Sequence, residues 1–137
     1  MITTERASRT PSRTAAAAAS VCRVLVSVFL VFVAVSKLLR LPFMVDTTVN
    51  RMGFPVSVMP VIGTVLLVCL ALYLVPRTEI LGAVALSGVV GGAVAVHLRI
   101  GAPLLPDYLV VLGFGVLVWL PLYLRNDLVR RIVRDGR

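Results

Sequence analysis

Few side chains in this chain of 137 residues could carry catalytic or metal chemistry. The two cysteines, Cys22 and Cys69, lie far apart in the sequence and form no C-x-x-C pair. We therefore expect two reduced thiols packed among apolar side chains, and no self-contained dithiol exchanger. His97 is the one histidine. Because a metal site usually needs several His, Cys or carboxylate ligands, we predict no metal site, and any enzymatic activity stays open.

One group of polar residues is a candidate binding site for a ligand or a partner protein. Its members stand where apolar stretches end or begin, at what should be one level of the structure: Lys37, Arg40, His97, Arg99, Asp107 and Tyr108. One aspartate cannot neutralise three permanent cations, so this end should attract an anion, such as a lipid phosphate or an acidic partner surface. The alternative is that His97 and Arg99 only anchor a helix at a membrane boundary.

The elements that must hold these residues are apolar helices. Residues 52–76, 80–98 and 108–124 contain no charged side chain, and 59% of the chain is hydrophobic against 15% charged. A hydrocarbon core of about 30 Å needs about 20 helical residues, so each of these stretches is about one membrane crossing. Together with an earlier apolar stretch, they predict four helices near 16–41, 56–75, 78–98 and 108–125. The predicted fold is all-α, an integral membrane four-helix bundle with antiparallel up-down topology.

The first apolar stretch has two readings. Arg23 and Lys37 bound an apolar run of only 13 residues, so the helix crosses the membrane only if both basic side chains lie near the head groups. The alternative is a cleaved signal peptide, because a basic leader precedes an apolar run that ends in Ala34-Val35-Ser36. The apolar helical pattern continues to Leu41, which favours a retained helix.

The basic residues predict the orientation in the membrane. Four of the 14 lysines and arginines fall on one face of the predicted bundle: Lys37, Arg40, Arg51 and Arg99. The other ten fall with the two termini and the second connection. The positive-inside rule therefore places both termini in the cytoplasm, with the chain in the plasma membrane of a bacterial cell. The net charge of +8 is mainly a topology signal, and no nucleic-acid partner is expected, because the arginines flank apolar spans without interleaved exposed aromatic residues.

Three segments follow along the chain. Residues 1–14 are rich in Ser, Thr and Arg without apolar periodicity, which predicts a disordered cytoplasmic leader. Residues 15–125 form the four-helix domain, in which Thr78 should cap the third helix. Residues 126–137 have apolar side chains at helical spacing among arginines, which predicts a basic amphipathic tail along the inner leaflet. Each basic residue near anionic head groups contributes about 1 kcal/mol, so membrane lipids are a predicted partner.

Helix packing is predicted from small residues in the third and fourth spans. Lipid tails are as apolar as leucine, so membrane helices associate through close contact at small side chains. Small residues recur every four positions in the third span, and two glycines lie in the fourth. The predicted contact residues are Gly88, Gly91, Gly92, Ala95, Gly113 and Gly115.

Several segments resemble the DoxX-like family of small membrane proteins, over about residues 23–125. The most specific are Leu72-Tyr73-Leu74-Val75-Pro76-Arg77-Thr78, Leu81-Gly82-Ala83, Gly91-Gly92-Ala93-Val94-Ala95-Val96-His97-Leu98-Arg99, and Trp119 with Leu122-Tyr123-Leu124-Arg125. The resemblance implies four membrane helices. Some members of the family are similar to a subunit of a thiosulfate:quinone oxidoreductase, and one is linked to a membrane complex with a superoxide dismutase and a sulfurtransferase.

The resemblance implies an accessory subunit of a membrane redox, quinone-linked system. In that reading the polar cluster meets a quinone head group or a partner protein, with Val90 and Val94 as apolar walls and His97 as the hydrogen-bonding group. The alternative is a non-catalytic helper or scaffold that binds lipid, or that packs against other membrane proteins or a second copy of the chain.

Overall fold

The computed structural model describes residues 12–102, 105 and 107–136. Four segments are helical, long and apolar enough to cross a membrane: α1 (Arg13–Leu38), Val56–Leu74, α4 (Glu79–Arg99) and Tyr108–Arg125. The described residues contain no strand. The predicted all-α fold with four membrane helices is therefore confirmed.

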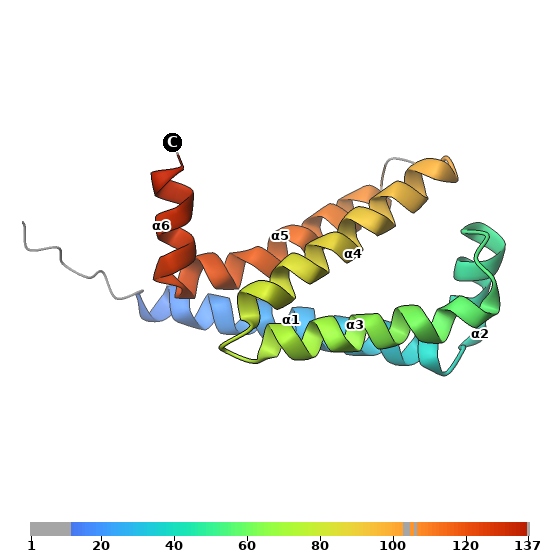
Figure 1. Cartoon of the computed structure of the whole chain (residues 1–137), viewed down its shortest axis with the longest axis horizontal. Coiled ribbons are helices and arrows are strands. Elements are labelled where there is room, and N and C mark those ends of the chain that lie inside the picture. The colour runs from blue at the N-terminus through green and yellow to red at the C-terminus, as the bar shows by residue number, and fades with distance from the viewer. Residues whose placement is uncertain (1–11, 103–104, 106, 137) are drawn as a thin grey trace, which may run out of the picture.

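Shorter helices join and extend these spans. Between the first two lie α2 (Pro42–Val45) and the π-helix η1 (Asp46–Arg51), and the second span consists of the 3₁₀ turn η2 (Val56–Val58) followed by α3 (Met59–Leu74). The fourth span is α5 (Asp107–Arg125), and the tail forms α6 (Asp127–Asp135). The tail is thus helical, and its axis runs across the long axis of the bundle (Figure 1).

The first helix begins and ends earlier than the predicted range 16–41. It starts at Arg13, because the Ser12 hydroxyl accepts a hydrogen bond from the Ala15 amide at 3.3 Å and so caps the helix. It ends at Leu38, because Arg40 takes a left-handed conformation (φ 51°) and Pro42 follows. Arg13 and Thr14 are therefore helical and not part of a disordered leader, whereas residues 1–11 lie outside the described residues.

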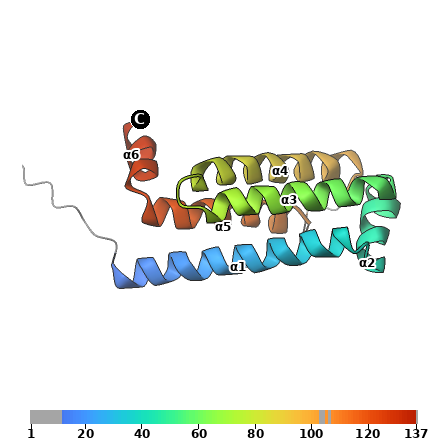
Figure 2. The ribbon, with the colours of Figure 1, turned by 60° about the horizontal axis from the view of Figure 1, so that its bottom comes forward.

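The four spanning helices form a ring of contacts, in which α1 and α4 each touch both α3 and α5. Figure 1 shows the α1–α3 pair and the α4–α5 pair close together at one end and diverging toward the other, and Figure 2 shows α1 extending past the turn between α3 and α4. The end at which the two pairs lie close together contains the α3–α4 turn, the end of α5 and Arg23 of α1, and we call it the Arg23 end. The opposite end, where α4 stops, is the His97 end.

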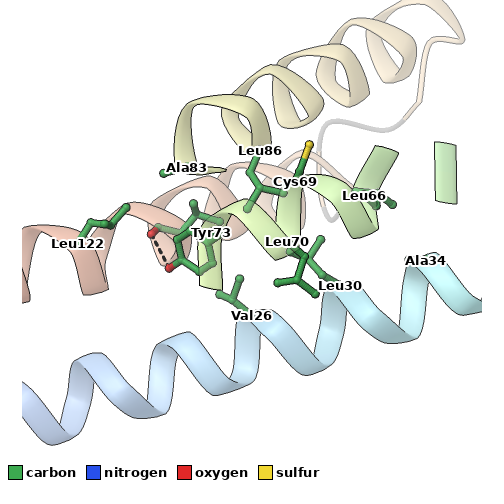
Figure 3. Close-up of a cluster of buried hydrophobic side chains, with 11 residues drawn as sticks. Val26, Leu30, Ala34, Leu66, Cys69, Leu70, Tyr73, Ala83, Leu86 and Leu122 are labelled. Carbon is green, nitrogen blue, oxygen red and sulfur yellow. Dashed lines mark hydrogen bonds between the residues drawn. The ribbon is translucent and has the colours of Figure 1, made fainter. Parts of the chain in front are cut away.

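Buried side chains hold the helices together near the Arg23 end. All three buried residues of α4, Gly82, Ala83 and Leu86, lie in its first turns. Figure 3 shows Leu86 beside Tyr73, whose hydroxyl donates a hydrogen bond to the Val118 carbonyl oxygen at 2.9 Å. Tyr73 is only 1% exposed, so this bond satisfies a phenol that would otherwise be buried without a partner.

Two glycines make the close helix approaches. A Cβ added at Gly82 would overlap the backbone N and Cα of Tyr73, and one at Gly63 would lie 2.9 Å from the Ala34 carbonyl oxygen. These two residues let α4 approach α3 and let α3 approach α1 closely enough for backbone contact.

Most of the predicted contact glycines meet no other helix within the part of the chain that the structure describes. A Cβ at Gly88, Gly91, Gly92 or Gly113 would meet no atom within 4 Å, and Ala95 is exposed. Only Gly115 has a neighbour, since its added Cβ would lie 3.6 Å from Val90. The reason is that α4 meets α5 through another face: Ser87 accepts a hydrogen bond from the Trp119 indole at 2.8 Å, and Val90 approaches Gly115.

Candidate functional site

His97, near the end of α4, is held by two contacts. Its Nδ1 lies 2.7 Å from the Ala93 carbonyl oxygen, and its ring meets the Tyr108 ring edge-on at a centroid distance of 6.1 Å. Because a carbonyl oxygen only accepts hydrogen bonds, Nδ1 carries the proton, and Nε2 of the neutral ring is an acceptor. The structure therefore brings together two of the predicted site residues, from adjacent helices, with one ring nitrogen left for a ligand.

Lys37 forms a different contact at the same end. Its ammonium group donates a hydrogen bond to the Thr48 hydroxyl at 3.1 Å, and Thr48 is fully buried. Since Thr48 belongs to η1, this bond fastens the connection between the first two spans to α1. Arg40, at its left-handed position, is exposed.

The predicted site residues whose side chains the structure describes make no single network of contacts. Among the described residues, no hydrogen bond, ion pair or ring contact joins Lys37 or Arg40 to His97 or Tyr108. The physical reason is the divergence of the helix pairs toward the His97 end (Figure 1). Arg99 is exposed, and the side chain of Asp107 lies outside the described part. The predicted cluster is thus divided into a Lys37–Thr48 pair and a His97–Tyr108 pair.

The densest polar network lies at the Arg23 end. The Arg23 guanidinium donates hydrogen bonds to the carbonyl oxygens of Tyr73 and Leu74, at 2.9 and 2.8 Å, and lies 5.4 Å from the centroid of the Tyr73 ring. These two carbonyls belong to the last turn of α3, where helix geometry leaves carbonyl oxygens without intrahelical partners. A cation at this position is also favoured by the helix dipole.

Glu79 completes the network from the first turn of α4. One carboxylate oxygen lies 3.4 Å from the Arg23 Nη1, and the other accepts a hydrogen bond from the Asn126 side chain at 3.2 Å. Asn126 also caps α6 by accepting a bond from the Leu128 amide at 3.0 Å. The network therefore ties α1, the end of α3, the start of α4 and the α5–α6 junction to one charge pair.

Thr78 does not cap α4 through its side chain, as had been expected from the sequence. Its hydroxyl donates instead to the Leu72 carbonyl oxygen at 2.9 Å, so it closes the turn back onto the end of α3. The favourable charge at the start of α4 comes from Glu79 alone.

Sequence reasoning missed the Arg23–Glu79 pair, although a signal was present. Arg23 interrupts an otherwise apolar stretch, and Glu79, at the start of the third span, is the one acidic residue between Asp46 and Asp107. Charged residues within membrane segments commonly pair with each other or with backbone carbonyls, which is the arrangement found. The sequence alone also fits a head-group position for Arg23, in which its charge needs no acidic partner.

The described side chains at the two ends form no group of metal ligands. In the described ranges, no three His, Cys, Asp or Glu residues are close enough to hold a metal ion. Cys69 is buried and Cys22 is half-buried, and both are free thiols. The arrangement offers a fixed charge pair at the Arg23 end and an imidazole acceptor at the His97 end.

Comparison with known proteins agrees with the resemblance seen in the sequence. The family model described as DoxX-like family matches residues 21–120, which include most of each of the four spanning helices. No curated protein and no solved structure matches the chain. Four apolar helices, with most of their length covered by that match, show that this chain belongs to the DoxX-like family.

Proposed function

We propose that this chain is an accessory subunit of a quinone-linked membrane redox system, and that it meets the quinone head group or the redox partner at the His97–Tyr108 pair. The observation that carries the proposal is the fixed imidazole. His97 is half-buried at the end of a spanning helix, its Nδ1 proton is held by Ala93, and its ring rests against Tyr108.

The imidazole suits a hydroxyl-bearing ligand. With Nδ1 donating to a carbonyl, Nε2 accepts a hydrogen bond from a quinol hydroxyl or from a donor on a partner protein. Nε2 forms no hydrogen bond to the described part of the chain. The role as a subunit is consistent with the family's similarity to the quinone-linked oxidoreductase subunit noted above.

The test is co-purification from native membranes in mild detergent. Bound quinones are extracted and quantified by chromatography, and bound proteins are identified by mass spectrometry. The wild-type chain is expected to retain a quinone or a redox protein, and His97→Ala is expected to lose it while the chain stays folded. His97→Gln, which keeps an acceptor near the position of Nε2, should retain part of the binding. Arg40→Gln, at an exposed position away from the pair, is the matched control.

Two results would refute the redox proposal. One is a wild-type chain that carries neither a quinone nor a redox protein. The other is a His97→Ala chain that retains every species bound by the wild type.

A second candidate function, a non-catalytic helper that packs against other membrane proteins or a second copy, is favoured by the open glycine face of α4. A Cβ added at Gly88, Gly91 or Gly92 would meet no other part of the described chain within 4 Å. Small residues on one helix face are where a second membrane helix approaches closely. Gly92→Leu should then remove co-purifying proteins, or the dimer, without changing the stability of the single chain. Under the redox proposal, it should leave quinone binding intact.

The chain is a multi-pass membrane protein, and we assign it to the bacterial plasma membrane with both termini in the cytoplasm. The ten-to-four distribution of basic residues supports this orientation. In it, the Arg23 end faces the cytoplasm, and α6 can lie along the inner leaflet with its exposed Leu128, Ile132 and Val133 toward lipid.

A further inference from the structure

An open groove of about 400 Å³ runs along α1 at the Arg23 end. Its walls come from three helices: Ser20, Arg23, Val24, Ser27 and Val28 of α1, Leu74 of α3 and Arg125 of α5. Ser20, Val24 and Val28 are spaced four apart, so they lie on one helix face. Val28 lies eight positions after Ser20, so the groove follows the helix for about 12 Å, at ~1.5 Å per residue.

The groove is apolar along its length. Val24 and Val28 are 60% and 63% exposed, and Leu74 is 45% exposed, so none of the three is covered by the rest of the chain. Val21 and Leu25, beside the groove on α1, are exposed as well. On a helix that crosses a membrane, such a face lies against lipid chains.

Two guanidinium groups stand at the groove, and they differ in what they bind. Arg23 is engaged by Glu79 and by two carbonyl oxygens, so its charge is compensated. Arg125 has no carboxylate within 4.0 Å in the part of the chain that the structure describes. The neighbouring Arg130 is engaged as well, since it donates to the Tyr123 and Leu124 carbonyl oxygens at the end of α5. The groove therefore carries the uncompensated positive charge of Arg125.

We propose that this groove binds an anionic phospholipid from the leaflet at the Arg23 end. The phosphate pairs with Arg125, and one acyl chain lies along Val24 and Val28. A guanidinium recognises phosphate through two parallel hydrogen bonds. The apolar stretches of α3, α4 and α5 all begin or end at this level, so Arg125 stands at head-group depth while the valines lie deeper in the hydrocarbon. This site is separate from the His97 end and does not depend on the function proposed there.

A lipid is favoured over a protein as the occupant because the groove is charged at one end and runs along the membrane-spanning direction of α1. The groove runs along a membrane helix, with a cation at its head-group end and apolar walls below, which matches the shape and polarity of a phospholipid. The one compensated and one uncompensated arginine give a net positive site, which selects an anionic head group over a zwitterionic one.

Native mass spectrometry of the delipidated full-length chain in detergent tests the head-group half of this proposal. The probes are dioleoyl phosphatidylglycerol and dioleoyl phosphatidylcholine, which share their acyl chains. The wild type is expected to prefer phosphatidylglycerol. Arg125→Gln should weaken phosphatidylglycerol binding about fivefold, which corresponds to the ~1 kcal/mol typical of one basic residue at a head group. It should weaken phosphatidylcholine binding less, because the choline already offsets the charge of the phosphate that the two lipids share. Arg131→Gln, with the same loss of charge on exposed α6, should have little effect.

A second variant tests the acyl-chain half. Val28→Trp places a large side chain in the groove at an exposed position, so it should weaken the binding of both lipids without unfolding the chain. Circular dichroism checks that the helices remain folded. Equal losses for Arg125→Gln and Arg131→Gln would mean attraction to general surface charge and would overturn the proposal. Wild-type binding that does not distinguish the two lipids, or Val28→Trp binding equal to wild type, would overturn it as well.

Discussion

The Arg23 guanidinium of α1 lies 3.4 Å from the Glu79 carboxylate of α4, although the two helices do not lie side by side as principal neighbours in the bundle. The pair reaches across the end of α3, whose last carbonyl oxygens Arg23 also binds. Both side chains are mostly buried, at 16% and 20% exposed. Arg23 and Glu79 therefore compensate each other's charge and close the Arg23 end of the bundle.

Loss of Arg23 should lower stability more than loss of the Glu79 charge. Arg23→Met removes the ion pair and leaves the Tyr73 and Leu74 carbonyl oxygens and one of the two Glu79 carboxylate oxygens without their donor. Hydrogen bonds to charged groups contribute about 1.5–3 kcal/mol, and we expect a loss in this range. Glu79→Gln should cost less, because Arg23 keeps its two carbonyl partners. Thermal unfolding in detergent measures both, with Arg77→Met at an exposed position as the control.

A double-variant cycle measures the interaction energy between Arg23 and Glu79 apart from their contacts with other residues. The Arg23→Met, Glu79→Gln double variant should be less destabilised than the sum of the two single losses, by about 0.5 kcal/mol or more. Strict additivity would show that the two groups do not interact in the folded chain.

Gly82→Ala should destabilise the fold, whereas Gly92→Ala should not. The methyl group at position 82 would overlap the Tyr73 backbone, so α3 and α4 must move apart, and overpacking of this kind typically costs ~1–3 kcal/mol. At position 92 it meets no atom within 4 Å. Even Gly92→Leu should leave the unfolding temperature of the single chain unchanged. A stable Gly82→Ala chain would contradict the close α3–α4 approach.

Tyr73→Phe should lower stability by about 0.5–1.5 kcal/mol, because it removes the hydrogen bond from the buried hydroxyl to the Val118 carbonyl oxygen. The ring, and hence its packing in the core, is kept. Tyr123→Phe is the matched control, since Tyr123 is 40% exposed. Equal unfolding temperatures for the two variants would show that the hydroxyl bond does not stabilise the bundle.

Cysteine labelling tests the orientation in the membrane. In a chain with Cys22→Ala and Cys69→Ala, Asn50→Cys should react with an impermeant maleimide from outside intact cells. Arg134→Cys should react only after permeabilisation. Both positions are exposed, whereas Thr48, in the same connection as Asn50, is fully buried and would label poorly in either orientation. The reverse pattern would place the termini outside.

Binding sites were harder to predict from the sequence than helices. Six residues at similar depth suggested one polar cluster, but depth along a helix says nothing about which face a residue occupies or how far apart two helices are. In the structure, His97 contacts Tyr108 and Lys37 contacts Thr48. The two contacts are separate because the α1–α3 pair and the α4–α5 pair diverge toward this end. Small residues at regular spacing predicted helix contacts at Gly88, Gly91 and Gly92 of α4, but spacing does not say which face of the helix meets a neighbour. The close contact is at Gly82, which was not among the predicted contact residues.

The sequence by itself determined that this chain is a four-helix membrane protein and where each helix lies, to within a few residues. Uncharged stretches of about one membrane thickness can be satisfied only as helices in lipid, because every backbone polar group must find a partner within its own segment. Only the tertiary structure decided which faces meet. Apolar side chains lie on all sides of these helices, so the hydrophobic pattern of the sequence gives no signal of the packed side. The Arg23–Glu79 pair, the Gly82–Tyr73 contact and the groove at Arg125 depend on steric fit and charge pairing between residues distant in the sequence.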